Sequence, residues 1–247
     1  MSSTAKYVIV AALEREISGL VRGWQRVQVG NLKAWRQGET VAVTVGMGWE
    51  KAFAGTNVVI ETFRPELVTS IGFSGSLSTE LPVGSIVVPA QVVGFKTGIA
   101  FEAAYGAGVL VTAAGVVGAN DKAEMGSRFG ALAVDMEAAG VAEAATVSRV
   151  KFAAIKAISD GVNDEMDFVG AFVTPEGFKT GAFLMHVAVR PRLWRALKQL
   201  AQNTQKASEA LTAALRDFTA EPEAFLARYS NQSTLGSLAS EAQSARK

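Results

Sequence analysis

Short apolar runs that suit β-strands alternate with helical segments along almost the whole chain. The clearest run, at residues 7–12, reads Tyr-Val-Ile-Val-Ala-Ala and is typical of a strand buried on both faces of a sheet. Further strands are expected at 27–29, 34–37, 41–45, 67–71, 86–88, 92–95, 109–112, 132–135 and 152–158, and helices at 14–22, 50–63, 121–129, 136–148 and 178–189. This alternation predicts an α/β fold, a single domain with a central mixed, mainly parallel sheet flanked by helices.

Residues 192–218 are expected to form a long final helix that completes a domain spanning 1–218. Apolar residues recur in it in alternating steps of four and three, a heptad seam that includes Leu197, Leu211 and Phe218. Such a stripe packs on the body of the same chain or on a second subunit. The first residues of this helix are basic and include Trp194, so contact with a membrane surface is an alternative, although it is not favoured. Residues 219–247 are polar and are expected to be a loosely ordered tail.

Composition excludes several classes of chemistry. The chain has no Cys and one His among 247 residues, so disulfides, thiol catalysis and a zinc site rich in these residues are excluded, and no metal is expected. With 24 Lys and Arg against 23 Asp and Glu, no global field recruits nucleic acid. The apolar stretches are too short for a membrane span or a signal peptide. We expect a soluble, cytoplasmic protein whose acid–base chemistry rests on carboxylates.

Candidate functional residues follow the expected strands, because ligands of open α/β sheets bind beyond the carboxyl ends of the strands. Five strand ends carry glycine or carboxylate: 13–16, 46–48, 72–76, 135–137 and 159–161. Each alone is more typical of a tight turn or a helix start. Five of them in one chain favour a binding site.

The segments at 133–139, Ala-Val-Asp-Met-Glu-Ala-Ala, and at 155–160, Ile-Lys-Ala-Ile-Ser-Asp, form the most specific pattern. They resemble the V-E-M-E-x-A and R-A-I-S-D segments of the nucleoside phosphorylase and nucleosidase superfamily, in particular its 5′-methylthioadenosine/S-adenosylhomocysteine nucleosidase branch and the hopanoid-associated phosphorylase-like proteins. The resemblance extends over 7–189, including the opening strand and both glycine loops. It implies cleavage of the N-glycosidic bond of a purine nucleoside, with adenine expected as the base, by a homo-oligomer, most simply a dimer, without a metal or organic cofactor.

The resemblance also implies roles for individual residues. Asp160 would be the general acid at N7 of the departing base, with a pKa raised by burial and with Ser159 orienting it. Glu137 would hold the ribose hydroxyls, Met136 would pack on the sugar, and Glu16 would activate water. The remaining substrate-binding candidates are Phe73, Ser74, Gly75, Val116, Val117 and Phe168. The candidate phosphate or water site is Gly46, Met47 and Gly48.

Some positions depart from the family pattern. The segment in which nucleosidases usually present an aromatic ring offers only Val116 and Val117, so the base site is expected to be aliphatic or to use Phe73 or Phe168. Lys156 stands where the family commonly has arginine. The short span between the second glycine loop and the 133–139 segment suggests an open site that admits a bulky 5′ substituent.

Alternative functions remain open at this point. Phosphorolysis would need cations that converge on phosphate as co-substrate, but Arg15, Arg22 and Lys51 lie in no phosphate motif, and Glu16 favours hydrolysis. A non-catalytic nucleoside-binding protein would not need both the acid and the sugar-binding carboxylate. A nicotinamide-dependent oxidoreductase is disfavoured, since no G-x-G-x-x-G follows the first strand.

Overall fold

The computed structural model describes residues 4–164, 170, 172–174, 177–178 and 192–230. Its strands are β1 (Tyr7–Ala11), β2 (Gln25–Val29), β3 (Leu32–Gln37), β4 (Thr40–Thr44), β5 (Leu67–Ser76), β6 (Ile86–Val87), β7 (Gln91–Gly94), β8 (Ala100–Glu102), β9 (Val109–Thr112), β10 (Ala131–Asp135), β11 (Lys151–Asp160), β12 (Val173–Thr174) and β13 (Gly177–Phe178). Its helices are α1 (Glu14–Ile17), α2 (Trp49–Phe63), α3 (Ala119–Phe129), α4 (Ala138–Val147), α7 (Arg192–Ala220) and α8 (Pro222–Ser230).

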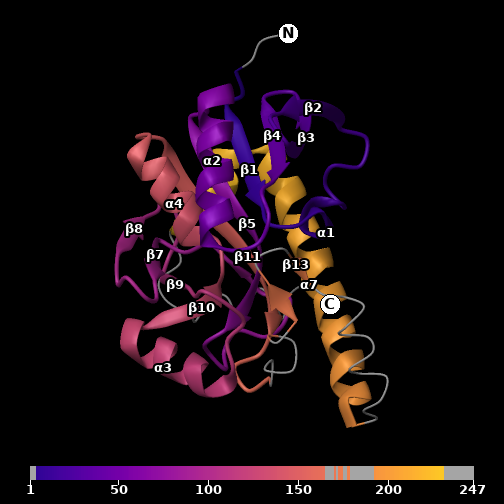
Figure 1. Cartoon of the computed structure of the whole chain (residues 1–247), viewed down its shortest axis with the longest axis vertical. Coiled ribbons are helices and arrows are strands. Elements are labelled where there is room, and N and C mark those ends of the chain that lie inside the picture. Colours follow the sequence, from indigo (N-terminus) through magenta and orange to yellow (C-terminus); the bar gives the residue numbers. More distant parts are fainter. Residues whose placement is uncertain (1–3, 165–169, 171, 175–176, 179–191, 231–247) are drawn as a thin grey trace.

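Eleven of the described strands form a mixed sheet in the order β2-β3-β4-β1-β5-β10-β9-β7-β8, with β11 beside β5 and β6 beside β11. Strands β12 and β13 form a separate two-stranded sheet. Strands β4, β1, β5 and β11 run parallel, whereas β10 runs antiparallel to the end of β5. Residue Gly75 of β5 lies between Val134 of β10 and Asp160 of β11. Helices flank the sheet, so the predicted α/β fold is confirmed (Figure 1).

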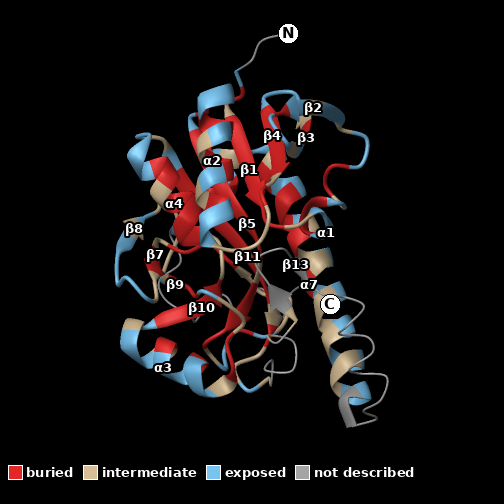
Figure 2. Cartoon of the chain, viewed as in Figure 1, coloured by how far each residue is buried: buried red, intermediate tan, exposed pale blue. Residues whose placement is uncertain are grey.

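The sheet is buried on both faces. In β1, Val8 and Val10 pack with α2 and α4, whereas Ile9 and Ala11 pack with α1, α7 and α8 on the opposite face. The strand is buried throughout, as the continuous apolar run at its positions predicts. Figure 2 shows the buried strands between helices whose outer faces are exposed.

Helices α2 and α4 approach each other closely because α4 is rich in alanine and contains Gly140. A Cβ at position 140 would lie 2.4 Å from the carbonyl oxygen of Trp49, the first residue of α2. This contact places the beginnings of the two helices side by side. The loop at 46–48, just before α2, therefore lies next to Glu137, just before α4.

The heptad stripe of α7 packs largely on its own chain. Ala207, Leu211, Ala214 and Phe218 are buried against the sheet and α8. The N-terminal half of α7 extends past the sheet and is half-buried to exposed (Figure 2). None of the described helices is both long and apolar enough to span a bilayer. A dimer and a membrane-surface contact stay predictions.

Two expected elements differ from the structure, and a third lies almost wholly outside the described residues. The helix expected at 14–22 ends at Ile17, and the following turn packs on α7, where a Cβ at Gly19 would lie 2.6 Å from Thr212 Oγ1. Strand β5 continues to Ser76 because β11 and β10 pair with its second half. The helix expected at 178–189 lies outside the described residues except for Phe178, which belongs to β13.

The expected loose tail at 219–247 is wrong for its first part. Residues Pro222–Ser230 form α8, and Phe225 and Leu226 are buried on it. The ring of Phe225 lies 6.0 Å from that of Phe218 in an edge-to-face arrangement. Composition did not reveal this helix because only two of its residues, Phe225 and Leu226, are buried. Residues 231–247 lie outside the described residues.

Candidate active site

A cavity of about 330 Å³ opens where β1, β5, β10 and β11 end. It brings together most of the residues that the sequence singles out: Glu16, Met47, Phe73, Ser74, Gly75, Val116, Val117, Met136, Glu137, Ser159 and Asp160. Gly46 does not line it, and Gly48 lines a neighbouring cavity of about 680 Å³ that shares Met47, Gly115, Val116 and Met136 with the first. Phe168 lies outside the described residues. Segments far apart in the sequence thus form one site.

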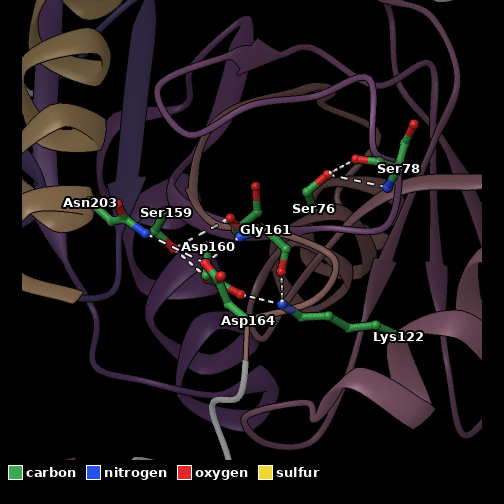
Figure 3. A network of polar contacts seen from close by, with 9 residues as sticks. Ser76, Ser78, Lys122, Ser159, Asp160, Gly161, Asp164 and Asn203 are labelled. Carbon is green, nitrogen blue, oxygen red and sulfur yellow. Dashed lines mark hydrogen bonds and ion pairs between the residues drawn. The ribbon is translucent and has the colours of Figure 1, made fainter. Parts of the chain in front are cut away.

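Asp160 is the last residue of β11, and both of its carboxylate oxygens are hydrogen-bonded. Ser159 Oγ donates to Oδ1 over 2.7 Å, and Lys122 Nζ donates to Oδ2 over 2.5 Å (Figure 3). The contact between Ser159 and Asp160 is the one that an orienting serine would make. The pairing with Lys122 was not expected from the sequence.

Glu137 lies between β10 and α4, and the amide of Gly48 donates to its Oε1 over 2.9 Å. Burial, together with the nearby charge of Asp135, raises the pKa of Glu137 to about 8. Its Oε2 has no hydrogen bond within the described residues. Near neutral pH the side chain can therefore donate as well as accept a hydrogen bond at the cavity wall.

Glu16 lies in α1, just after β1. Its Oε2 accepts hydrogen bonds from the amides of Ala12 and Leu13 over 3.0 and 2.9 Å. Burial raises its pKa, and these bonds and the charge of Lys156 oppose that shift. A Cβ at Gly72 would lie 3.1 Å from Glu16 Oε1, so the bare backbone there makes room for the carboxylate. A buried carboxylate with a raised pKa suits a general base.

A buried ion pair supports the wall of the cavity. Lys156 Nζ lies 2.8 Å from Asp135 Oδ2 and 3.0 Å from Ser70 Oγ. Thr112 Oγ1 donates to Asp135 Oδ1 over 2.7 Å, and the amide of Ala138 donates to Oδ2 over 2.8 Å. The carboxylate of Asp135 therefore holds the beginning of α4. Lys156, at the position where the family commonly has arginine, is the cation of this pair.

The structure adds contacts of the predicted residues and lining residues that were not singled out as site residues. The guanidinium of Arg15 lies 5.9 Å from the ring centre of Phe73, and α7 contributes Leu200 and Thr204. Ser74 Oγ is buried and has no hydrogen-bond partner within the described residues. Lys122 is 38 residues from Asp160, and a lone lysine in a short helix is normally exposed. A pair of residues this far apart produces no periodic pattern in the sequence, so it could not be predicted.

A family model described as the phosphorylase superfamily matches residues 6–105 and 96–184. Among relatives, the 5′-methylthioadenosine/S-adenosylhomocysteine nucleosidase of Staphylococcus haemolyticus is 26% identical over 200 residues, which cover 64% of this chain and 88% of that protein. The nucleosidase of the same description from Chromohalobacter salexigens is 27% identical over 164 residues, 52% of this chain and 70% of that protein.

Solved structures share the fold. The S-adenosylhomocysteine nucleosidase of Streptococcus pyogenes, in complex with 5-methylthiotubericidin, has a TM-score of 0.60 at 22% identity, covering 74% of this chain and 96% of that one. The futalosine hydrolase of Helicobacter pylori has a TM-score of 0.62 at 18% identity, covering 87% of this chain and 98% of that one.

Proposed function

The chain belongs to the phosphorylase superfamily, and on this premise we propose that it cleaves the N-glycosidic bond of a purine nucleoside by hydrolysis. The observation that carries the proposal is the meeting of Glu16, Glu137 and Asp160 in one cavity at the ends of the central strands. Cleavage of this bond needs a proton for the departing base, stabilisation of an oxocarbenium-like sugar and an activated nucleophile. Three carboxyl groups can divide these tasks.

The surroundings of each group support a separate role for it. Asp160, oriented by Ser159, passes a proton to N7 of the base as the bond between C1′ and N9 breaks and its electron pair moves into the purine. Glu137 binds the ribose hydroxyls through its free Oε2, and Met136 packs on the sugar. Glu16 takes a proton from the water that attacks C1′, and the bonds from Ala12 and Leu13 hold its carboxylate in place.

Charge around the cavity favours water over phosphate as the nucleophile. Four carboxyl groups line it, those of Glu16, Asp135, Glu137 and Asp160. The lining cations among the described residues are Arg15 and Lys122, and Lys122 is already paired with Asp160. Phosphate sites normally gather several free cations or glycine-loop amides. Among the described lining residues, Arg15 is therefore the one cation that is not paired with a carboxylate, fewer than a phosphate site normally uses.

Adenine is the base that we propose, with support from the names of the relatives and from the lining of the cavity. Phe73, Val116 and Val117 offer apolar surface for a flat heterocycle. Ser74 Oγ, buried and without a partner in the described part of the chain, offers a polar contact to the edge of a base. The neighbouring cavity would leave room for a substituent at the 5′ position.

The proposal is tested by product analysis. The protein is incubated with adenosine, 5′-methylthioadenosine or S-adenosylhomocysteine, each with and without phosphate, and free base, reducing sugar and sugar 1-phosphate are measured. Free adenine with a reducing sugar, independent of phosphate, is the expected result. A sugar 1-phosphate that forms only with phosphate would replace hydrolysis by phosphorolysis. Binding without release from any of the three would contradict cleavage of these nucleosides.

A further inference from the structure

Lys122 is the feature of the cavity that the proposed roles leave unexplained. It lies in α3, and its side chain is only 1% exposed. Its Nζ donates to Asp160 Oδ2 over 2.5 Å and to the carbonyl oxygen of Gly161 over 2.7 Å. Figure 3 shows the ammonium reaching the end of β11 from the side opposite Asn203 of α7. Burying an ammonium is costly unless it is paired, so the chain maintains this contact against a large desolvation penalty.

The backbone of β5 is shaped around this pair. A Cβ at Gly75 would lie 2.7 Å from Asp160 Oδ2 and 3.2 Å from Lys122 Cε. A larger residue at position 75 would displace the carboxylate of Asp160 and press on the side chain of Lys122. The loop after β11 is held as well, because Asp164 Oδ2 accepts from the amide of Gly161 over 2.8 Å. Lys122 and Asp160 therefore meet in a closely fitted arrangement.

We propose that Lys122 is the positioning residue of Asp160 and the source of the proton that Asp160 delivers to the departing base. The inference rests on the proposed function. As the bond between C1′ and N9 breaks, a proton moves from Lys122 Nζ to Asp160 Oδ2, and the proton of the resulting carboxylic acid moves to N7. The base leaves neutral, Lys122 is left neutral, and Asp160 is again a carboxylate. Water adds to C1′ and its proton passes to Glu16. Glu16 then releases this proton to solvent while solvent returns a proton to Lys122, which restores both groups.

Charge balance favours this route. Before the reaction the Lys122–Asp160 pair is neutral overall, and after it has given up a proton it carries one negative charge. That charge appears while the sugar becomes positive, so the cavity stabilises the oxocarbenium-like state more than the ground state. A carboxyl group that held its own proton beside the ammonium would forgo the charge-assisted hydrogen bond seen here.

Several other charged groups line the cavity around the Lys122–Asp160 pair. Those that line it from the packed elements are Arg15 and Glu16 of α1, Asp135 of β10 and Glu137 before α4. Asp164 follows β11, and the described part of α7 contributes only the uncharged Leu200 and Thr204 to the lining. Among the described residues, Lys122 alone forms an ion pair with Asp160.

The test compares Lys122→Met and Lys122→Arg with the wild type, with Lys151→Met as the control because Lys151 is exposed at the far end of β11. Base release is measured as kcat/KM against pH, and thermal unfolding checks the fold. In Lys122→Met, Asp160 must hold its own proton, so the alkaline limb is expected to move to lower pH by about one unit or more. Arginine keeps the charge but gives up no proton, so Lys122→Arg is expected to lose about 10²-fold or more at every pH.

A merely structural tie between α3 and β11 predicts the opposite pattern. Lys122→Arg would then restore activity, and Lys122→Met would lower kcat/KM by the same factor at every pH; either result would overturn the proposal. If one of the two Lys122 variants fails to fold, the pH profile of the other variant tests the proposal by itself. Absence of base release by the wild type would instead contradict the proposed function. Failure of the Lys122 proposal can therefore be distinguished from failure of the proposed function.

Discussion

The amide nitrogen of Gly48 donates a hydrogen bond to Oε1 of Glu137 over 2.9 Å, joining segments 89 residues apart in the sequence. The bond connects the loop before α2 to the residue before α4, where Gly140 lets the two helices touch. It fixes one oxygen of Glu137 and leaves the other for a ligand. A packing contact between two helices thereby sets the geometry of a side chain in the cavity.

Replacing Glu137 by Gln should weaken catalysis while keeping the fold. Glutamine retains an oxygen that can accept from the Gly48 amide, but it cannot ionise, so it cannot present a carboxylate to the sugar as positive charge develops there. We expect kcat/KM to fall about 10- to 100-fold, because a hydrogen bond to a charged group is worth about 1.5–3 kcal/mol. Steady-state kinetics of base release measure the change. Unaltered kcat and KM would exclude a role for Glu137 in sugar binding.

The same variant should alter the pH dependence of stability. The pKa of Glu137 is raised from 4.5 to about 8, so the folded chain binds more protons than the unfolded chain between these values. The free energy of unfolding must then fall as pH rises through this window. Between pH 5.5 and 8.5 the wild type should lose about 1 kcal/mol or more relative to Glu137→Gln, since one pKa unit corresponds to about 1.4 kcal/mol. Urea unfolding at both pH values measures this, and parallel losses in the two proteins would be inconsistent with the raised pKa.

The Lys156–Asp135 ion pair should be essential for stability. Lys156→Met leaves the buried carboxylate of Asp135 without its cation, and breaking a buried pair in this way costs about 3–5 kcal/mol. The exposed pair of Lys33 and Glu14 is the control, and Lys33→Met should cost about 1 kcal/mol or less. Denaturant unfolding of both variants tests the contrast. If both variants lost the same free energy of unfolding, the buried pair would contribute no more to stability than the exposed pair.

Gly75→Ala should impair the reaction by displacing the Lys122–Asp160 pair. The added Cβ would clash with Asp160 Oδ2, and a shift of about 1 Å in a reacting group can cost about 10²-fold in rate. Gly115→Ala is the control for stability, because a Cβ there meets no atom within 4 Å. Base release and melting temperature are measured for each. A fully active Gly75→Ala protein would show that the fit around the pair is unimportant.

Much of the fold was predictable, because buried strands and amphipathic helices leave local patterns. The run that forms β1 and the positions of α2, β9 and α7 follow from apolar periodicity alone. The extension of β5 to Ser76 could not be predicted from local pattern. The segment is rich in glycine and resembles a loop, but its pairing with β10 and β11 makes it a strand. Helix α8 was missed because Phe225 and Leu226 are few apolar residues in a polar stretch.

The site was predictable to the extent that it lies at strand ends. The residues after β1, β10 and β11 were identified from their position and from family resemblance, and the cavity brings them together. Lys122 could not be found in this way, since nothing local links a lysine of α3 to the carboxylate at the end of β11. Its partner depends on how two distant elements pack.

Base release by Asp160→Asn, measured beside the wild type, tests whether Asp160 protonates the departing base. Asparagine keeps the shape of the side chain and can accept from Ser159, but it supplies no acidic proton. A positioned general acid typically contributes about 10²–10⁴-fold, so turnover should fall by that factor while the melting temperature shows that the chain is folded. Near-native turnover by folded Asp160→Asn would contradict the assignment of Asp160 as the group that protonates the departing base.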